Sequence, residues 1–253
     1  MKLIAGILFC LVMFIVIHFI KMMRMYLVLL EQKIELKSFI FAYFRTTLVN
    51  LIVPFKLGEI YRVVVYTRLS KAFGIGFFST LVDRFFDTLA LVLIIIPLAF
   101  VSPKSLNAVS VFLAVFLIFV IFVYVTFPSA YTYLNRYIIM NRSTKRSMMA
   151  LKGVETLDVA YKYVKKLVLG RYSLLILMSF LAWAMEGILL LIISRLAGID
   201  FNGAAFLEYI SSILSTNDSY LLSLYTKLGI CVIAVCTIVS GIGVLIKRRK
   251  AYL

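Results

Sequence analysis

The segment from Asn50 to Arg62 combines polar, turn-forming and charged residues between two apolar runs. Pro54 forbids an uninterrupted helix, and Gly58 permits tight turning of the backbone. A helix break at membrane depth is tolerated where its free backbone groups face protein or water, and it can aim helix ends at a polar ligand. Glu59 and Arg62 are three residues apart, so they share one face of a following helix. The alternative is an interfacial loop with a surface ion pair.

A second group of charged residues, Asp83, Arg84 and Asp87, lies inside a long apolar run. Charges in hydrocarbon are costly unless they pair or line a cavity, so such residues usually mark a functional site. The alternative is a self-contained Arg84–Asp87 pair that locks two helices. Because two acids face one base, an external partner is favoured, and Arg62 or Arg45 could supply it.

Glu186 is the third charge inside an apolar run, and Trp183 lies three residues before it on the same helix face. The carboxylate could pair with Arg84 or with a basic group of residues 54–62. The sequence is compatible with two roles for Glu186, a structural ion pair and a contact with substrate.

Enzyme chemistry finds little support in the sequence. The single histidine, His18, has no acidic or cysteine neighbour, and Cys10, Cys231 and Cys236 lie in apolar runs without metal-ligand spacing. Phosphate-binding loops and zinc-binding motifs are not found. We therefore expect no metal and no cofactor, and an enzyme is the less favoured class.

The elements that must position these residues are membrane helices. The chain has 253 residues, of which 64% are hydrophobic and 15% charged, whereas soluble domains are about half apolar and a quarter charged. Five runs are long enough to cross a bilayer: 3–20, 73–101, 106–127, 172–193 and 228–246. The shorter runs 39–53 and 203–215 are predicted to be re-entrant or membrane-buried. The sequence thus predicts an all-α polytopic membrane protein, with residues 1–253 forming one transmembrane domain.

The distribution of basic residues predicts the topology in the cell membrane. With the N-terminus outside and run 39–53 re-entrant from the cytoplasm, most of the 27 Lys and Arg residues face inward, as the positive-inside rule requires. The C-terminus is then cytoplasmic. A net charge of +16 could indicate nucleic-acid binding, but no readout motif accompanies it, so we expect no nucleic-acid partner.

Residues 128–171 form the longest stretch between predicted spans. Apolar residues recur there at helical spacing with basic residues between them. This pattern predicts a cytoplasmic, basic, amphipathic loop helix lying on the inner leaflet, where its cations meet anionic lipid. A helix packed under the bundle is the alternative.

The sequence resembles the transmembrane region family of lysyl-phosphatidylglycerol synthases, which includes many stand-alone flippase-like proteins. The resemblance covers about residues 20–200. It is carried by the pattern N-x-x-x-P-x-x-x-G-E-x-x-R from Asn50 to Arg62, then by Asp83, Arg84 and Asp87, and by a W-x-x-E at Trp183 and Glu186. Residues 211–218 stand where the family usually has a Pro-Gly-Gly motif. The family's aminoacyl-transferase domain is not in this sequence, so lysyl transfer is not implied.

The resemblance implies a protein that binds an anionic phospholipid or lipid-linked saccharide and flips it between leaflets in envelope biogenesis. The substrate-binding residues it implies are Asn50, Pro54, Gly58, Glu59, Arg62, Asp83, Arg84, Asp87 and Glu186. We predict that Arg62 holds the lipid phosphate and that Glu59 orients Arg62 in the empty site. The alternatives are a membrane-embedded glycosyl or acyl transferase, and a non-catalytic scaffold that docks an envelope glycosyltransferase through residues 128–171.

Overall fold

A computed structural model describes residues 2–53, 57–101, 108–141, 145–214 and 219–251, and every regular element among them is a helix. The elements are α1 (Lys2–Leu29), the short 3-10 helix η1 (Leu30–Gln32), α2 (Leu36–Ile52), α3 (Leu57–Ser70), α4 (Phe73–Val101), α5 (Ala108–Asn141), α6 (Lys145–Ala197), α7 (Gly203–Leu214) and α8 (Tyr220–Ala251).

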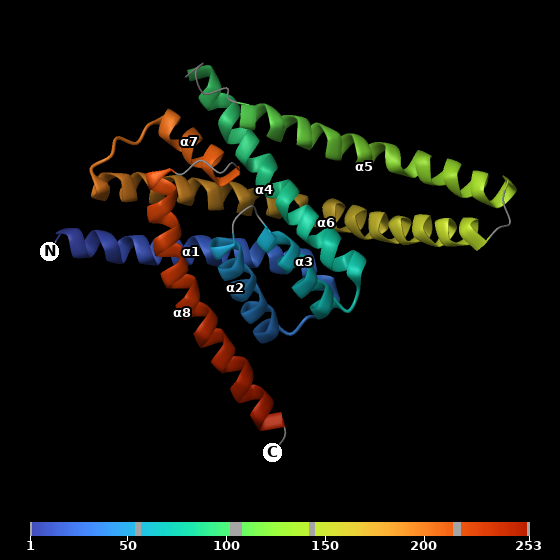
Figure 1. The fold of residues 1–253 in the computed structure, drawn as a ribbon, viewed down its shortest axis with the longest axis horizontal. Coiled ribbons are helices and arrows are strands. Elements are labelled where there is room, and N and C mark those ends of the chain that lie inside the picture. The colour runs from blue at the N-terminus through green and yellow to red at the C-terminus, as the bar shows by residue number, and fades with distance from the viewer. Residues whose placement is uncertain (1, 54–56, 102–107, 142–144, 215–218, 252–253) are drawn as a thin grey trace.

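Most of the helices meet near the centre of the molecule (Figure 1). The 53-residue α6 runs alongside α1, and α4 crosses and packs against α6. The short helices α2 and α3 pack together, with α3 lying on α4 and α2 lying on α8. The largest apolar core joins α1, α4, α6, α7 and α8 through buried side chains that include Phe14, Leu189, Leu190 and Ile233. These contacts hold the polar faces of α1, α3, α4 and α6 against one another.

Four helical segments in the described part of the chain are long and apolar enough to cross a membrane: Ile4–Gln32, Val111–Met140, Ser147–Ala197 and Tyr220–Lys247. They overlap four of the five predicted spans. The fifth, α4, has 29 residues, and its length of about 44 Å exceeds a bilayer core. Its first half, however, carries Asp83, Arg84 and Asp87. The prediction of an all-α polytopic membrane protein is confirmed.

The two segments predicted to be too short for a full crossing are short helices. Helix α2 has 17 residues and α7 has 12, whereas a crossing helix needs about 20. Helix α3, which follows α2, has 14 residues. The break between α2 and α3 coincides with Pro54, which itself lies outside the described residues.

The described part of residues 128–171 belongs to two long helices that continue into the neighbouring spans, whereas the sequence predicted a separate loop helix between them. Pro128 lies inside α5, and α6 already begins at Lys145. Aromatic contacts extend the pairing of these helices beyond the apolar runs, since the Tyr161 ring lies 5.2 Å from the Tyr124 ring and 4.9 Å from the Phe127 ring. Sequence alone did not indicate that these rings would meet.

The later part of the same segment packs against the bundle. Leu167 is buried, Tyr163 Oη donates to the Val28 carbonyl at 2.8 Å, and Arg171 Nη1 donates to the Leu27 carbonyl at 2.9 Å. These contacts attach α6 to the end of α1. This part of the segment therefore packs on α1, as the alternative of a packed helix expects, and the position of its basic residues on the inner leaflet stays a prediction.

Candidate functional site

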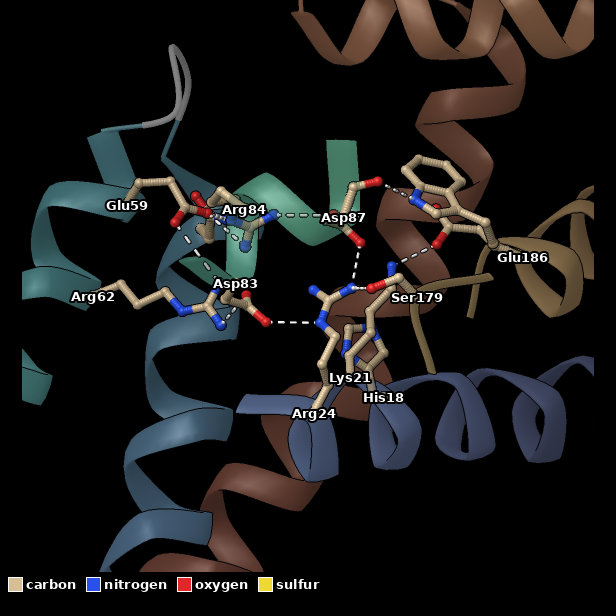
Figure 2. A network of polar contacts seen from close by, with 12 residues as sticks. His18, Lys21, Arg24, Glu59, Arg62, Asp83, Arg84, Asp87, Ser179 and Glu186 are labelled. Carbon is tan, nitrogen blue, oxygen red and sulfur yellow. Dashed lines mark hydrogen bonds and ion pairs between the residues drawn. The ribbon is translucent and has the colours of Figure 1, made fainter. Parts of the chain in front are cut away.

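Asp83 lies at the centre of a buried polar site formed by four helices (Figure 2). Its Oδ1 accepts a hydrogen bond from Arg24 Nε on α1 at 2.7 Å, and its Oδ2 accepts one from Arg62 Nη2 on α3 at 3.0 Å. The Asp83 side chain is fully buried, so both guanidinium groups compensate a carboxylate that water does not reach. One carboxylate of α4 therefore joins α1 and α3.

Arg24 also binds the next turn of α4 and reaches α6. Its Nη1 donates to Asp87 Oδ1 at 2.6 Å and to Ser179 Oγ at 2.9 Å. Asp83 and Asp87 can share one arginine because residues four apart lie on the same helix face. Arg24 thus connects the two acids of α4 to α6 as well as to α1.

The outer edge of the site is formed by Glu59 and Arg84. Glu59 Oε1 lies 2.8 Å from Arg84 Nη2, and Glu59 Oε2 lies 3.7 Å from Arg62 Nη1. The Arg84 side chain is 39% exposed and that of Glu59 is 22% exposed, whereas Arg62 and Arg24 are almost fully buried. Arg84 is therefore the arginine of the site most open to an incoming ligand.

Asn50 and Gly58 set the position of Glu59. Asn50 Nδ2 donates to Glu59 Oε1 at 2.7 Å, across the break between α2 and α3. A Cβ atom at Gly58 would lie 2.5 Å from the Asn50 Cα atom, so only glycine allows the two helix ends to approach this closely. The glycine of the sequence pattern is needed for this approach of the backbones.

Glu186 belongs to a second ion pair at the other end of the site. Its Oε2 lies 2.5 Å from Lys21 Nζ on α1, and its Oε1 accepts a hydrogen bond from Tyr209 Oη on α7 at 2.8 Å. The suggested pairing of Glu186 with Arg84 is wrong, as is a pairing with Arg62, and Lys56 lies outside the described residues. Helix α1 packs along α6 and places Lys21 next to this carboxylate.

Trp183 connects the Lys21–Glu186 pair to the ion pairs around Asp83 and Asp87. Its Nε1 donates to the Asp87 carbonyl at 3.1 Å, and Lys21 Nζ lies 5.6 Å from the centre of its ring. Such a cation–π contact is favourable, especially where water is excluded. The W-x-x-E spacing thus places the tryptophan against α4 and the glutamate against α1.

The structure brings together eight of the nine residues predicted for the site, all except Pro54, which is outside the described residues. The cross-helix carboxylate–guanidinium contact expected from Arg62 is present. Arg45, the other expected partner, is instead exposed and stacks on the Tyr61 ring at 5.4 Å. The Arg84–Asp87 contact, at 3.5 Å, is one part of the larger network rather than an isolated pair.

Sequence reasoning missed Lys21 and Arg24 because they look like the basic flank of the first span. The signal that could have found them is the apolar sequence that resumes after Arg24 and lengthens α1 to 28 residues. A helix of that length places both cations well before its end. Ser179 and Tyr209 carried no signal in the sequence.

We call the eight charged residues of this site the polar cluster: Lys21, Arg24, Glu59, Arg62, Asp83, Arg84, Asp87 and Glu186. Four bases face four acids, so the cluster is neutral as a whole. Its three arginines can bind a phosphate through paired hydrogen bonds if a carboxylate moves aside. Among the described residues no group of His, Cys, Asp and Glu could hold a metal ion.

Comparison with known proteins gives one family. The family model described as "Lysylphosphatidylglycerol synthase TM region" matches residues 3–245. No curated protein and no solved structure gives a significant match. The family match agrees with a multi-pass membrane protein that takes part in lipid biosynthesis or transport. Because the match spans nearly the whole chain, including every residue of the polar cluster, the protein belongs to the family of lysylphosphatidylglycerol synthase transmembrane regions.

Proposed function

We propose that this protein binds the headgroup of an anionic phospholipid or a lipid-linked saccharide at the polar cluster and moves the lipid between leaflets. The observation that carries the proposal is a neutral, largely buried cluster of four acids and four bases held between α1, α3, α4 and α6. Burying so many charges costs free energy, because water solvates each of them better than the protein interior does. Such buried charges in a membrane protein therefore indicate a functional site.

The headgroup phosphate makes its first contact at Arg84. This guanidinium is the most exposed of the cluster, and its partner Glu59 is the most exposed carboxylate. A phosphate can replace Glu59 there with similar charge and a better bidentate fit to the guanidinium. The anion thus enters by exchange, without leaving Arg84 unpaired.

Arg62 binds the phosphate at the next step. Glu59 lies between the two arginines, 2.8 Å from Arg84 and 3.7 Å from Arg62, so its displacement exposes both. The sequence predicted that Arg62 holds the phosphate, and in the structure Arg62 is buried against Asp83. The geometry therefore supports Arg84 as the first ligand and Arg62 as the second.

The lipid tails stay in contact with apolar surface throughout. Large apolar side chains cover the outer faces of α1 and α5, with Leu8, Ile118 and Phe119 all well exposed. Acyl or polyprenyl chains can remain beside such surfaces, in hydrocarbon, while the headgroup crosses along the charges.

The test is lipid exchange by the purified protein alone, reconstituted in liposomes that contain a fluorescent phosphatidylglycerol. Arg84→Lys and Arg62→Lys keep the charge but lose the paired hydrogen bonds, and Glu59→Gln loses the exchangeable anion. We expect each to slow exchange by about tenfold or more, since one charge-assisted hydrogen bond contributes about 1.5–3 kcal/mol. Arg45→Lys, at the exposed arginine outside the cluster, is the matched control and should keep the wild-type rate.

Other outcomes identify the alternatives. Unchanged exchange in all three cluster variants, at equal reconstitution, would remove these residues from the mechanism. A new lipid product formed by the purified protein would indicate a membrane-embedded glycosyl or acyl transferase. Absence of both activities, with co-purification of an envelope glycosyltransferase, would indicate a scaffold.

A further inference from the structure

The corner of the polar cluster at the break between α2 and α3 contains buried polar atoms without hydrogen-bond partners. In the described part of the chain, seven buried side-chain atoms lack such a partner. Four of them lie at this corner: Asn50 Oδ1, Glu59 Oε2, Arg62 Nε and Arg84 Nε. A buried polar atom without a partner costs free energy, and folded proteins contain few of them. Their concentration at one corner indicates that a ligand or water supplies the missing hydrogen bonds.

The four residues of this corner contact one another through Glu59. Its Oε1 accepts a hydrogen bond from Asn50 Nδ2 at 2.7 Å and lies 2.8 Å from Arg84 Nη2. Its Oε2 lies 3.7 Å from Arg62 Nη1, beyond hydrogen-bond distance. Dashed lines in Figure 2 join the Glu59 carboxylate to both arginines. We call Asn50, Glu59, Arg62 and Arg84 the break corner.

The unpaired atoms of the break corner are two donors and two acceptors, and this combination selects the group that can satisfy them. The two Nε atoms can donate to a phosphate oxygen. A phosphodiester has no proton to donate, so Asn50 Oδ1 and Glu59 Oε2 stay unpaired beside a phosphate alone. A hydroxyl group can both donate to these oxygens and accept from an arginine. An ammonium group can only donate, and the positive charges of Arg62 and Arg84 repel it.

The exchange of Glu59 for a phosphate increases the need for such a donor. Once a phosphate takes its place at Arg84, the carboxylate has lost its contact at 2.8 Å and keeps the hydrogen bond from Asn50 Nδ2. The Glu59 side chain is only 22% exposed, and a partly buried carboxylate needs donors in place of the water it lacks. A hydroxyl group on the bound headgroup provides one at the moment of exchange.

We propose that Asn50 and Glu59 bind a hydroxyl group of the headgroup while Arg84 and Arg62 bind its phosphate. The substrate is then an anionic lipid whose phosphate carries a glycerol or a sugar. This inference rests on the proposed function and specifies the headgroup. In both kinds of headgroup a hydroxyl stands on the carbon next to the ester carbon, so it stays close to the phosphate and reaches groups beside it.

Gly58 leaves room beside the acceptor that Asn50 contributes. A Cβ atom at Gly58 would lie 2.6 Å from Asn50 Oδ1, closer than any ordinary contact. Every other residue type would therefore press a side chain against this oxygen. The glycine thus serves the binding of the hydroxyl as well as the approach of the two helix ends.

The role of the hydroxyl is tested with two lipids that share their chains and their phosphodiester charge. Short-chain phosphatidylglycerol has two headgroup hydroxyls, whereas phosphatidylpropanol has none. By isothermal titration calorimetry, the detergent-solubilised protein should bind phosphatidylglycerol about tenfold more tightly, the effect of one hydrogen bond to a charged group. Phosphatidylethanolamine, which offers an ammonium group, should bind no better than phosphatidylpropanol.

Phosphatidylinositol separates the two kinds of hydroxyl-bearing headgroup. Its ring hydroxyls resemble those of a sugar, and one of them stands next to the phosphate ester. Tighter binding of phosphatidylinositol than of phosphatidylglycerol would support a sugar headgroup, and weaker binding would support glycerol. Either lipid should bind more tightly than phosphatidylpropanol.

Two variants assign the preference to the break corner. Glu59→Gln and Asn50→Ala each remove one acceptor, so the preference for phosphatidylglycerol over phosphatidylpropanol should fall from about tenfold toward equal binding. In Glu59→Gln the affinity for phosphatidylpropanol should rise, because its phosphate no longer competes with a carboxylate for Arg84. Damage to the fold would instead weaken the binding of both lipids. Glu155→Gln, at an exposed residue of α6, is the matched control and should keep the full preference.

Equal binding of phosphatidylglycerol and phosphatidylpropanol by the wild type would overturn the proposal and leave the unpaired atoms to water. A preference that persists in both corner variants would also overturn it, and if one variant fails to fold, the other decides. Tighter binding of phosphatidylethanolamine than of phosphatidylglycerol would contradict the hydroxyl as well.

The outcome is separate from that of the proposed function. A clear hydroxyl preference in a protein that does not exchange lipid in liposomes would support the break corner and contradict translocation. Lipid exchange without any hydroxyl preference in binding would contradict this inference alone. If none of the lipids binds, both the inference and the headgroup site on which it rests are wrong.

Discussion

Asp83 receives one guanidinium from α1 and another from α3, while its own side chain is out of contact with solvent. Neither arginine can lose its charge, so the carboxylate is needed for both to stay buried. At the scale of single residues, Asp83 is therefore where a small change should have the largest effect on stability.

Asp83→Asn keeps the shape of the side chain and removes its charge. We expect a loss of about 3–5 kcal/mol, the usual result of removing one partner from a buried ion pair. Thermal unfolding in detergent can be followed by thiol labelling of the buried Cys10, in a background with Cys231 and Cys236 replaced by serine. The labelling midpoint should fall by several degrees.

Asp158→Asn is the matched control for this measurement. Asp158 pairs with Lys162 one turn away on the same helix, and that lysine is largely exposed. Its midpoint should stay near that of the parent. An equal fall in both variants would show that Asp83 is not more important to the fold than an ordinary helix pair.

At the scale of elements, the approach of α2 to α3 and of α3 to α4 depends on two glycines. A Cβ atom at Gly58 would lie 2.5 Å from Asn50 Cα, and one at Gly76 would lie 2.4 Å from the Thr67 backbone nitrogen. Backbone atoms cannot yield by rotating a side chain, so the helices themselves would have to separate. Glu59 and Asp83 would then move apart, because they are carried by α3 and α4.

Gly58→Ala and Gly76→Ala should consequently lower both stability and lipid exchange. Gly153→Ala, near the start of α6, meets nothing within 4 Å and should be neutral or stabilising by up to about 1 kcal/mol, as alanine favours helix. Midpoints and exchange rates of the three variants check this expectation. A neutral Gly58→Ala would contradict the requirement for close approach of α2 to α3.

The sequence predicts the acids of the cluster better than its bases, for a physical reason. Asp83, Asp87 and Glu186 stand out because a carboxylate inside an apolar run is unfavourable wherever that run is buried. Lys21 and Arg24 do not stand out, since a cation at the end of an apolar run is also the usual signal of membrane orientation. A cation of the buried site and a cation that orients the helix in the membrane look the same in the sequence. They differ in whether the helix continues inside the protein, and that depends on how α1 packs on α6.

The extent of α5 and α6 shows the same limit. Residues 128–171 lie between two apolar runs, so the sequence predicted a loop helix there that is separate from the spans. In the structure both helices continue through this segment, and the Tyr161 ring contacts the rings of Tyr124 and Phe127 across the pair. Contacts between residues this far apart in sequence are not visible in local patterns. The helix type, the polar break and the apolar surface were predictable, whereas helix pairing and the partners of Glu186 were not.

At the scale of the whole molecule, the orientation in the membrane can be tested on exposed positions of the fold. The charge distribution predicts that α3 ends in the cytoplasm, that the first half of α6 is cytoplasmic, and that the segment before α7 is outside. Arg68, Lys166 and Asp200 are exposed residues in these three places.

Single cysteines at these positions, in a background without the native three, should differ in their reaction with a membrane-impermeant thiol reagent. In intact cells, Asp200→Cys should be labelled, while Arg68→Cys and Lys166→Cys should be protected until the membrane is permeabilised. Labelling of all three after permeabilisation controls for burial. Labelling of Arg68→Cys from outside would mean that α2 crosses the membrane completely and that α3 lies outside. The Glu59–Arg84 edge of the polar cluster would then open toward the outer leaflet, and the lipid would be taken up from that side.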